Sequence, residues 1–151
     1  MNNCYIPLGD FVTEQERKEL LDIALNEEFV QHRSTKSGKA SPLNFKPIQF
    51  RNFERAWVMK MHPLAEQEMH TDGETLGRNV IIIHPLSENY APIVTQAGEV
   101  TQTAVINTQE YHAVYNNDQL RVNLQIPFPY NFEDIKNESH EFWDQVRSLY
   151  E

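Results

Sequence analysis

Apolar and polar residues follow two different periods along this chain. Near the N-terminus, the apolar residues between Leu20 and Leu25 recur at helical spacing, which predicts a helix over residues 14–29. Thr13 followed by Glu16 has the pattern of a capping box, in which each side chain hydrogen-bonds the backbone of the other residue. The sequence therefore predicts a capped helix close to the N-terminus.

A different pattern begins near residue 55 and continues to residue 128. Short runs rich in Val, Ile, Thr and aromatic residues are separated by Gly, Pro, Asn and Asp, which is typical of strands joined by turns. Residues 96–99 and 116–119 have the composition of hairpin turns. The predicted strands are Ala56–His62, Arg78–His84, Ile93–Gln96, Val100–Ile106, His112–Tyr115 and Leu120–Phe128.

The segments on either side of these strands have other patterns. Residues 32–47 are rich in Ser, Lys, Gly and Pro and predict a loop. Residues 139–150 carry apolar side chains at helical spacing, with Ser139 as the candidate N-cap, and predict a C-terminal helix. The order of helix, loop, many short strands and helix predicts a mainly β fold of the jelly-roll type, with flanking N- and C-terminal helices.

Length and composition narrow the class of protein. A chain of 151 residues, of which 40% are hydrophobic, suits a single domain over residues 1–151 with an ordinary buried core. The longest apolar run, Val80–Ile83, is too short to span a bilayer, and the first residues lack the features of a secretory signal, so we expect a cytoplasmic protein with no membrane partner. Because Cys4 is the only cysteine, an internal disulfide is excluded and a metal site would need histidine and carboxylate ligands.

The charge of the chain is unevenly distributed. A net charge of -9 argues against general affinity for nucleic acid. Residues 31–60 carry seven basic side chains and one acidic side chain, whereas the segments before and after them are acidic. This basic stretch would suit an acidic partner or a local nucleic-acid contact, but we interpret it as a solvated segment that balances an acidic body. The sequence does not indicate an oligomeric state.

His70, Thr71 and Asp72 form the strongest chemical pattern in the sequence. On an extended backbone, residues two apart point to the same side, so the imidazole and the carboxylate would converge as a divalent metal requires. His112 starts another predicted strand and would supply a third ligand. Two histidines and one carboxylate are the facial ligand set of non-haem Fe(II) oxygenases. The alternative is a surface histidine beside a turn, because Asp72 precedes a glycine.

Arg121 adds a cation to this pattern. Suppose that residues 116–119 form a hairpin loop, with Tyr115 paired to Leu120, and that side chains alternate between the two faces along both strands. Arg121 would then project on the same side as His112. A guanidinium near a metal can hold a distant carboxylate through two parallel hydrogen bonds, so a five-carbon diacid could chelate the metal at one end and pair with Arg121 at the other. The alternative is a strand arginine in a surface ion pair.

With these residues in place, residues 70–128 resemble the Fe(II)/2-oxoglutarate-dependent oxygenases, whose pattern is His-x-Asp, a distal His and a basic residue beyond it. The strand that begins at Arg78 is similar to prolyl hydroxylases, and the stretch from His112 to Arg121 is closer to aspartyl/asparaginyl hydroxylases. The chain departs from both groups, because prolyl hydroxylases usually have lysine at the position of Arg121 and aspartyl hydroxylases commonly lack the acid that Asp72 supplies. The matching segments are Met-His-Thr-Asp-Gly-Glu, Gly-Arg-Asn-Val-Ile-Ile-Ile-His-Pro-Leu, His-Ala-Val-Tyr-Asn and Arg-Val-Asn-Leu-Gln-Ile.

This resemblance implies a double-stranded β-helix, a cupin-like relative of the jelly roll, and a dioxygenase that hydroxylates a C–H bond. It implies that His70, Asp72 and His112 hold Fe(II). It also implies that Arg121 binds the C5 carboxylate of the cosubstrate 2-oxoglutarate, with Arg78 as a second residue that contacts cosubstrate or substrate. Dioxygen is the oxidant, and ascorbate is an optional reductant. Because both groups of relatives modify peptides, a peptide or protein side chain is the leading substrate, with a free amino acid or another small molecule still open.

Two other functions are compatible with the same residues. A cupin-like metal enzyme that does not use 2-oxoglutarate would have the same fold and ligands, and a non-catalytic jelly-roll binding module would use neither. Asn123 and Gln125 share the parity of Arg121 and are further candidates for a pocket lining, although ordinary sheet polarity explains them equally well.

Overall fold

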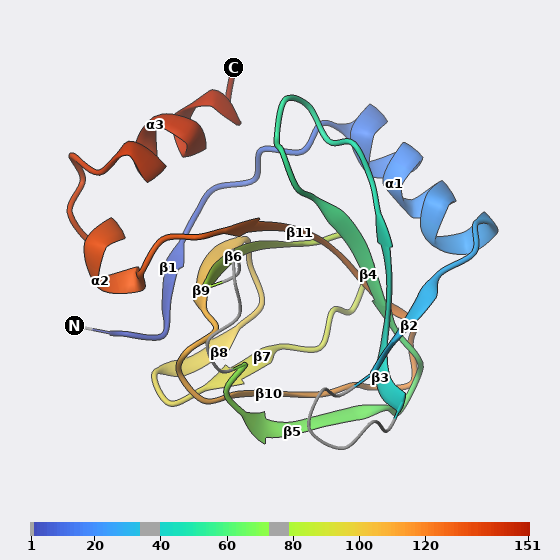
Figure 1. The fold of residues 1–151 in the computed structure, drawn as a ribbon. Helices are drawn as coiled ribbons and strands as arrows, with labels where there is room; N and C mark the ends of the chain where they lie inside the picture. The colour runs from blue at the N-terminus through green and yellow to red at the C-terminus, as the bar shows by residue number, and fades with distance from the viewer. Residues whose placement is uncertain (1, 34–39, 73–78) are drawn as a thin grey trace.

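The structure, a computed structural model, describes residues 2–33, 40–72 and 79–151. Its strands form two antiparallel sheets that face each other, and the helices lie outside the larger sheet (Figure 1). This arrangement confirms the predicted mainly β fold with flanking helices. The larger sheet contains, in spatial order, β1 (Tyr5–Pro7), β9 (Ala104–Asn107), β6 (Val80–Pro85), β11 (Arg121–Phe128), β4 (Trp57–Met61), β3 (Ala40–Pro47) and β2 (Val30–Arg33). The smaller sheet contains β5 (Glu66–His70), β10 (His112–Tyr115), β7 (Ile93–Thr95) and β8 (Gly98–Val100).

The first helix, α1 (Glu14–Asn26), begins at the predicted capping box. The backbone N–H of Glu16 donates to Oγ1 of Thr13 at 3.1 Å, and the backbone N–H of Thr13 donates to Oε1 of Glu16 at 3.0 Å. The helix ends three residues before the predicted boundary. Among the described residues, no helix has the length and apolar character needed to cross a bilayer.

The C-terminal region forms α2 (Phe132–Ile135) and α3 (Glu141–Ser148). The N-cap of α3 is His140, whose Nδ1 accepts a hydrogen bond from the backbone N–H of Phe142 at 3.1 Å. Ser139, the predicted N-cap, instead donates its hydroxyl to Oδ1 of Asn137 in the preceding turn. The helix was therefore predicted in the right place with its cap one residue too early.

Strand β11 separates the main core from the space between the sheets, because its side chains alternate between the two faces. Val122, Leu124 and Ile126 pack in the main core together with residues of all three helices. The odd-numbered residues face the smaller sheet, where Met61, the register partner of Arg121, packs with Val114. The polar residues of β11 are therefore carried into the interior between the sheets by the burial of their apolar neighbours.

The loop predicted for residues 32–47 is wrong over its described part. Strand β3 occupies residues 40–47 and pairs with β4, so that Leu43 lies opposite Met61 and Phe45 opposite Met59. The Ser, Lys and Pro residues of this segment obscured an alternating apolar pattern. Pairing with a buried central strand outweighs weak local preference, because what stabilises a strand is packing against its neighbours.

Four short edge strands, β1, β2, β5 and β8, were not predicted. They contain three to five residues, and β5 is an edge strand with the polar sequence Glu-Gln-Glu-Met-His. The predicted strand Val100–Ile106 is in fact divided between β8 and β9, which belong to different sheets. Such short edge strands have too few apolar residues to produce a periodic signal.

The turn predicted at residues 96–99 is confirmed, because Thr95 pairs with Gly98 across a two-residue loop. Gly98 adopts a φ of 125°, a conformation that favours glycine. The second predicted hairpin, at residues 116–119, is wrong: β10 pairs with β5 and β7, whereas β11 pairs with β4 and β6. The connection crosses between the sheets, and the buried Asn116 holds it by donating its amide to the carbonyls of His62 and Gln119.

Candidate functional site

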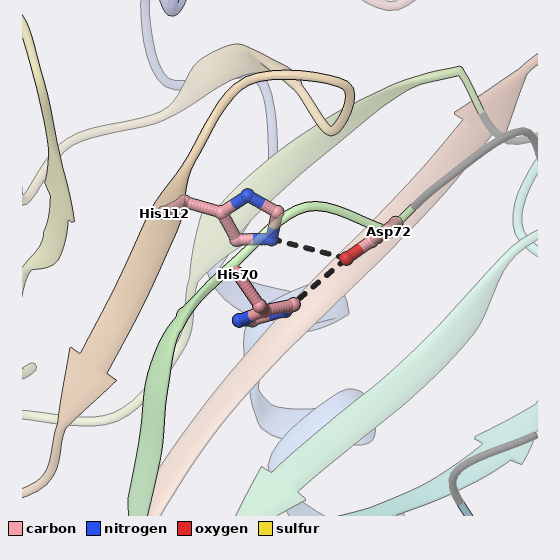
Figure 2. A group of neighbouring side chains, drawn as sticks. All are labelled: His70, Asp72 and His112. Carbon is pink, nitrogen blue, oxygen red and sulfur yellow. Dashed lines mark ion pairs between the residues drawn. The ribbon is translucent and has the colours of Figure 1, made fainter. Parts of the chain in front are cut away.

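His70, Asp72 and His112 converge at one end of the smaller sheet (Figure 2). His70 ends β5, His112 begins β10, and the two residues are direct register partners. Oδ1 of Asp72 lies 3.2 Å from Nε2 of His70 and 3.2 Å from Nε2 of His112. The predicted convergence of these three side chains is therefore present in the fold, and their potential ligand atoms all lie within 4.8 Å of one another.

Backbone carbonyls set the orientation of both imidazoles. Nδ1 of His70 lies 2.6 Å from the carbonyl oxygen of Glu68, and Nδ1 of His112 lies 2.8 Å from that of Glu110. Because a carbonyl oxygen can only accept, each Nδ1 carries the proton and donates it. Both Nε2 atoms are thereby turned toward Asp72, and this is the way in which metal-binding histidines are usually held.

Asp72 is held by its own backbone and is charged at neutral pH. Its backbone N–H donates to the carbonyl of Thr108 at 3.0 Å. Burial opposes ionisation of this carboxyl, but hydrogen bonds from His112 and His70 outweigh burial and hold the pKa of Asp72 below its usual range. The hydrogen bond to Asp72 in turn raises the pKa of His70, against the effect of burial.

The three residues fit a first-row divalent metal ion. Such ions bind nitrogen and oxygen at about 2.0–2.2 Å, so ligand atoms at right angles to one another lie about 3 Å apart. The distances of 3.2 Å from Asp72 to the two imidazoles match this spacing without any change of rotamer. The donor set of two neutral imidazoles and one carboxylate is the one that non-haem Fe(II) sites use, and it leaves positions open for other ligands.

Arg121 is a buried cation that lies at the start of β11 and is 4% exposed. Its Nε donates to the carbonyl of Ala91 at 3.0 Å, and its guanidinium carbon lies 4.0 Å from the centroid of the Tyr90 ring. One terminal nitrogen of the guanidinium is buried without a hydrogen-bond partner. Among the described residues, no acidic side chain forms an ion pair with Arg121. Burying a charge without a counter-ion is costly, so this site is suited to an anion.

Asn123 completes this polar corner of the interior. Its Nδ2 lies 2.8 Å from the hydroxyl of Tyr90, and its Oδ1 is buried without a partner. The next odd-numbered residue of β11, Gln125, is instead engaged: its Oε1 accepts a hydrogen bond of 2.7 Å from Nε1 of Trp57. Within β11, the buried groups without a hydrogen-bond partner therefore belong to Arg121 and Asn123, which lie two residues apart.

The remaining predicted residues have other positions. Arg78 lies outside the described residues. His84, which ends the predicted strand Arg78–His84, is buried, and its Nδ1 lies 2.6 Å from Oγ1 of Thr103. Tyr90 was not predicted as part of the site, because it lies in the segment between β6 and β7 and no local pattern marks it. Only the tertiary structure places its ring against Arg121.

Solved structures with a similar fold include three prolyl hydroxylases and a member of the 2OG-Fe(II) oxygenase family. A prolyl hydroxylase from Trichoplax adhaerens, solved in complex with a peptide fragment of the hypoxia inducible factor oxygen degradation domain, has a TM-score of 0.65 and 10% sequence identity, with 85% of this chain and 84% of that chain covered. A prolyl-4-hydroxylase from Pseudomonas putida has a TM-score of 0.61 and 12% identity, with coverage of 83% and 92%.

A third similar structure is the collagen prolyl hydroxylase of Paramecium Bursaria Chlorella virus-1, in complex with 2OG. Its TM-score is 0.56 at 12% identity, with 82% of this chain and 94% of that chain covered. No family model matches the sequence, and no curated protein matches it. The comparisons confirm the double-stranded β-helix, and with it the resemblance that the sequence indicated, at the level of the fold.

Proposed function

We propose that this protein is an Fe(II)- and 2-oxoglutarate-dependent dioxygenase that hydroxylates a C–H bond, with a peptide or protein side chain as the leading substrate and a free amino acid as the other. The observation that carries the proposal is the buried guanidinium of Arg121, of which one terminal nitrogen has no hydrogen-bond partner and which faces the same interior as the His70, Asp72 and His112 cluster. A binding module would not need a buried cation without a counter-ion beside three converging metal ligands. The shared fold supports the same reaction class.

In this proposal, His70, Asp72 and His112 hold the ferrous ion. When bound, Fe(II) supplies oxidation of a C–H bond, using dioxygen and 2-oxoglutarate. The chain contributes one negative charge at Asp72 and two imidazoles whose Nδ1 atoms are tied to the backbone. These bonds keep both Nε2 atoms directed at one point, so little movement of the side chains is needed when the metal binds.

Arg121, Tyr90 and Asn123 bind the distal carboxylate of the cosubstrate. The free terminal nitrogen of Arg121 donates to one carboxylate oxygen, which satisfies the unpaired charge. The amide NH₂ of Asn123 donates to the Tyr90 hydroxyl oxygen, which leaves the hydroxyl proton of Tyr90 as a second donor beside the guanidinium. The ring of Tyr90 covers the guanidinium and excludes water from the pair.

The register of the strands supports a cosubstrate that reaches from the metal ligands to Arg121. Val114 packs with Met61, the register partner of Arg121, so these residues lie at about the same level of the interior. His112 lies two residues before Val114, which corresponds to roughly 7 Å along a strand. A five-carbon diacid has a length of this order, and it would extend from the metal ligands inward to Arg121.

The test is an anaerobic titration of the protein with Fe(II) and then with 2-oxoglutarate. We expect a visible charge-transfer band that needs both additions, followed in air by succinate release that increases with the correct substrate from a panel of peptides and amino acids. Iron binding without this band would instead favour a cupin-like enzyme that does not use 2-oxoglutarate. A protein that binds neither would contradict the proposal. The peptide bound by a structurally similar prolyl hydroxylase supports a peptide or protein substrate.

A further inference from the structure

The outer face of the smaller sheet is not covered by any helix of the described chain. All three helices lie on the far side of the larger sheet (Figure 1). Within β7 and β10, Ile93 and Val114 point into the interior and pack there with Met61. Their neighbours in sequence therefore point outward, because side chains alternate along a strand.

Large side chains with apolar surface are exposed on this outer face. Met69 is 43% exposed, Tyr111 is 51% exposed and Tyr115 is 48% exposed. Met69 belongs to the edge strand β5, whose register against β10 shifts between Gln67 and His70, and Glu68 and Met69 are both exposed there. The two tyrosines belong to β10 and the residue before it. Because β10 lies between β5 and β7, the tyrosines occupy the middle of the face. Exposed tyrosines and methionines of this kind are enriched at protein interfaces.

Acidic side chains flank these residues on both sides. Glu66 and Glu68 are exposed on β5, and Glu66 is the register partner of Tyr115. On the other side, Glu99 of β8 is exposed and is paired with Val94. The four strands contain no lysine or arginine. From β5 to β8 the face spans three strand spacings, or about 14 Å. We call these residues, Glu66, Glu68, Met69, Glu99, Tyr111 and Tyr115, the acidic aromatic face.

The chemistry of the acidic aromatic face selects its partner. A second copy of the chain docked by the same face would bring six carboxylates together without a cation, which is unfavourable. Nucleic acid and anionic lipid surfaces are repelled for the same reason. A guanidinium fits, because it can lie flat on the ring of Tyr115 and at the same time pair with the adjacent carboxylate of Glu66.

We propose that the acidic aromatic face is a docking surface for an arginine-rich segment of a protein partner. The face lies directly behind the candidate metal centre, because Met69 precedes His70 and Tyr111 precedes His112. Where the proposed function holds, the partner is the protein substrate, which is tethered here while another segment enters the interior. The docking itself requires neither iron nor 2-oxoglutarate, so it can be tested separately from the proposed function.

The experiment is a fluorescence anisotropy titration of the metal-free protein with a labelled peptide of alternating arginine and serine. The test variant combines Glu66→Gln, Glu68→Gln and Glu99→Gln. The matched control combines Glu28→Gln, Glu54→Gln and Glu138→Gln, which removes three exposed charges outside the smaller sheet. We expect the test variant to weaken binding about tenfold and the control to weaken it less than about twofold, because close charges dominate at physiological salt. The peptide of alternating glutamate and serine should not bind.

The tyrosines give a second test that is independent of net charge. Tyr111→Ser combined with Tyr115→Ser should weaken binding about fivefold. This effect should persist at a salt concentration that screens the ion pairs. Amide shift mapping with the wild-type protein should locate the peptide on β5, β7, β8 and β10. Equal loss of binding in the two glutamate variants, or shifts centred on α3, would show a general attraction to an acidic protein and would overturn the proposal. Melting temperatures would establish that each variant is folded.

Discussion

His70 and His112 are register partners across β5 and β10, and the centroids of their rings lie 4.4 Å apart. Each ring is oriented by a hydrogen bond to the carbonyl oxygen two residues before it. The cluster is thus assembled by backbone pairing and local hydrogen bonds. A single substitution should therefore remove one ligand and leave the other two in position.

On this basis, His70→Ala should abolish stable iron binding. Removing a partner that only orients a metal ligand already costs about 10- to 100-fold in affinity, so removing the ligand itself should cost more than about 100-fold. Anaerobic titration with Fe(II), followed by measurement of iron content, tests this expectation. His62→Ala is the matched control, because His62 contacts Asn44 and lies outside the cluster. An unchanged iron content in His70→Ala would refute the ligand assignment.

Arg121→Ala should weaken 2-oxoglutarate binding severely and leave iron binding in place. Loss of one partner of a buried charge pair typically costs about 2–5 kcal/mol, which corresponds to a loss of roughly 30- to several-thousand-fold in affinity. The charge-transfer band gives the affinity of the iron-loaded protein for 2-oxoglutarate. Arg55→Ala removes an exposed arginine and serves as the control. Equal affinities in wild type and Arg121→Ala would remove Arg121 from the site.

Arg121→Met should not destabilise the ligand-free protein and should raise its melting temperature. Arg121 is a buried cation that lacks an acidic partner among the described residues, so an apolar side chain of similar length removes the cost of burying an uncompensated charge. Addition of 2-oxoglutarate with iron should raise the melting temperature of the wild type only. Calorimetry of both proteins, with and without ligand, measures the two effects. A large destabilisation of the ligand-free variant would mean that Arg121 serves the fold itself.

His84 should make the protein less stable in mild acid. Burial, partly opposed by Asp10 and reinforced by Arg17, lowers the pKa of His84 from 6.5 to about 4. Between these two values the unfolded chain binds a proton that the folded chain does not, so the stabilising contribution is complete above pH 6.5 and is lost as the pH falls toward 4. Between pH 7 and pH 5 this loss amounts to about 2 kcal/mol.

Urea denaturation of wild type and His84→Gln at both pH values tests this expectation. The difference isolates His84 from the carboxyl groups, which titrate in both proteins. The wild type should lose about 2 kcal/mol more than the variant between pH 7 and pH 5. His84→Gln is itself expected to be less stable at pH 7, because Nε2 of His84 accepts a hydrogen bond from Arg17 at 3.3 Å. Parallel pH profiles in the two proteins would show that His84 is not buried in the neutral form.

The sequence by itself determined the features that depend on neighbouring residues. The capping box at Thr13 and the convergence of His70 with Asp72 follow from backbone geometry over two to three residues. Alternation along β11 likewise separates Arg121 from the apolar residues beside it. Short-range patterns of this kind can be predicted from local backbone geometry, because they need no contact with a distant part of the chain.

Only the tertiary structure decided which strands pair and what surrounds the buried cation. The hairpin expected after Tyr115 does not form, because β10 pairs with strands of the smaller sheet and β11 pairs with strands of the larger sheet. Residues 40–47 form a strand because they pair with β4. Tyr90 contacts Arg121, although it lies in a connecting segment whose sequence has no periodic pattern. Long-range strand pairing depends on how much apolar surface the whole chain buries. A short stretch of sequence therefore cannot predict it.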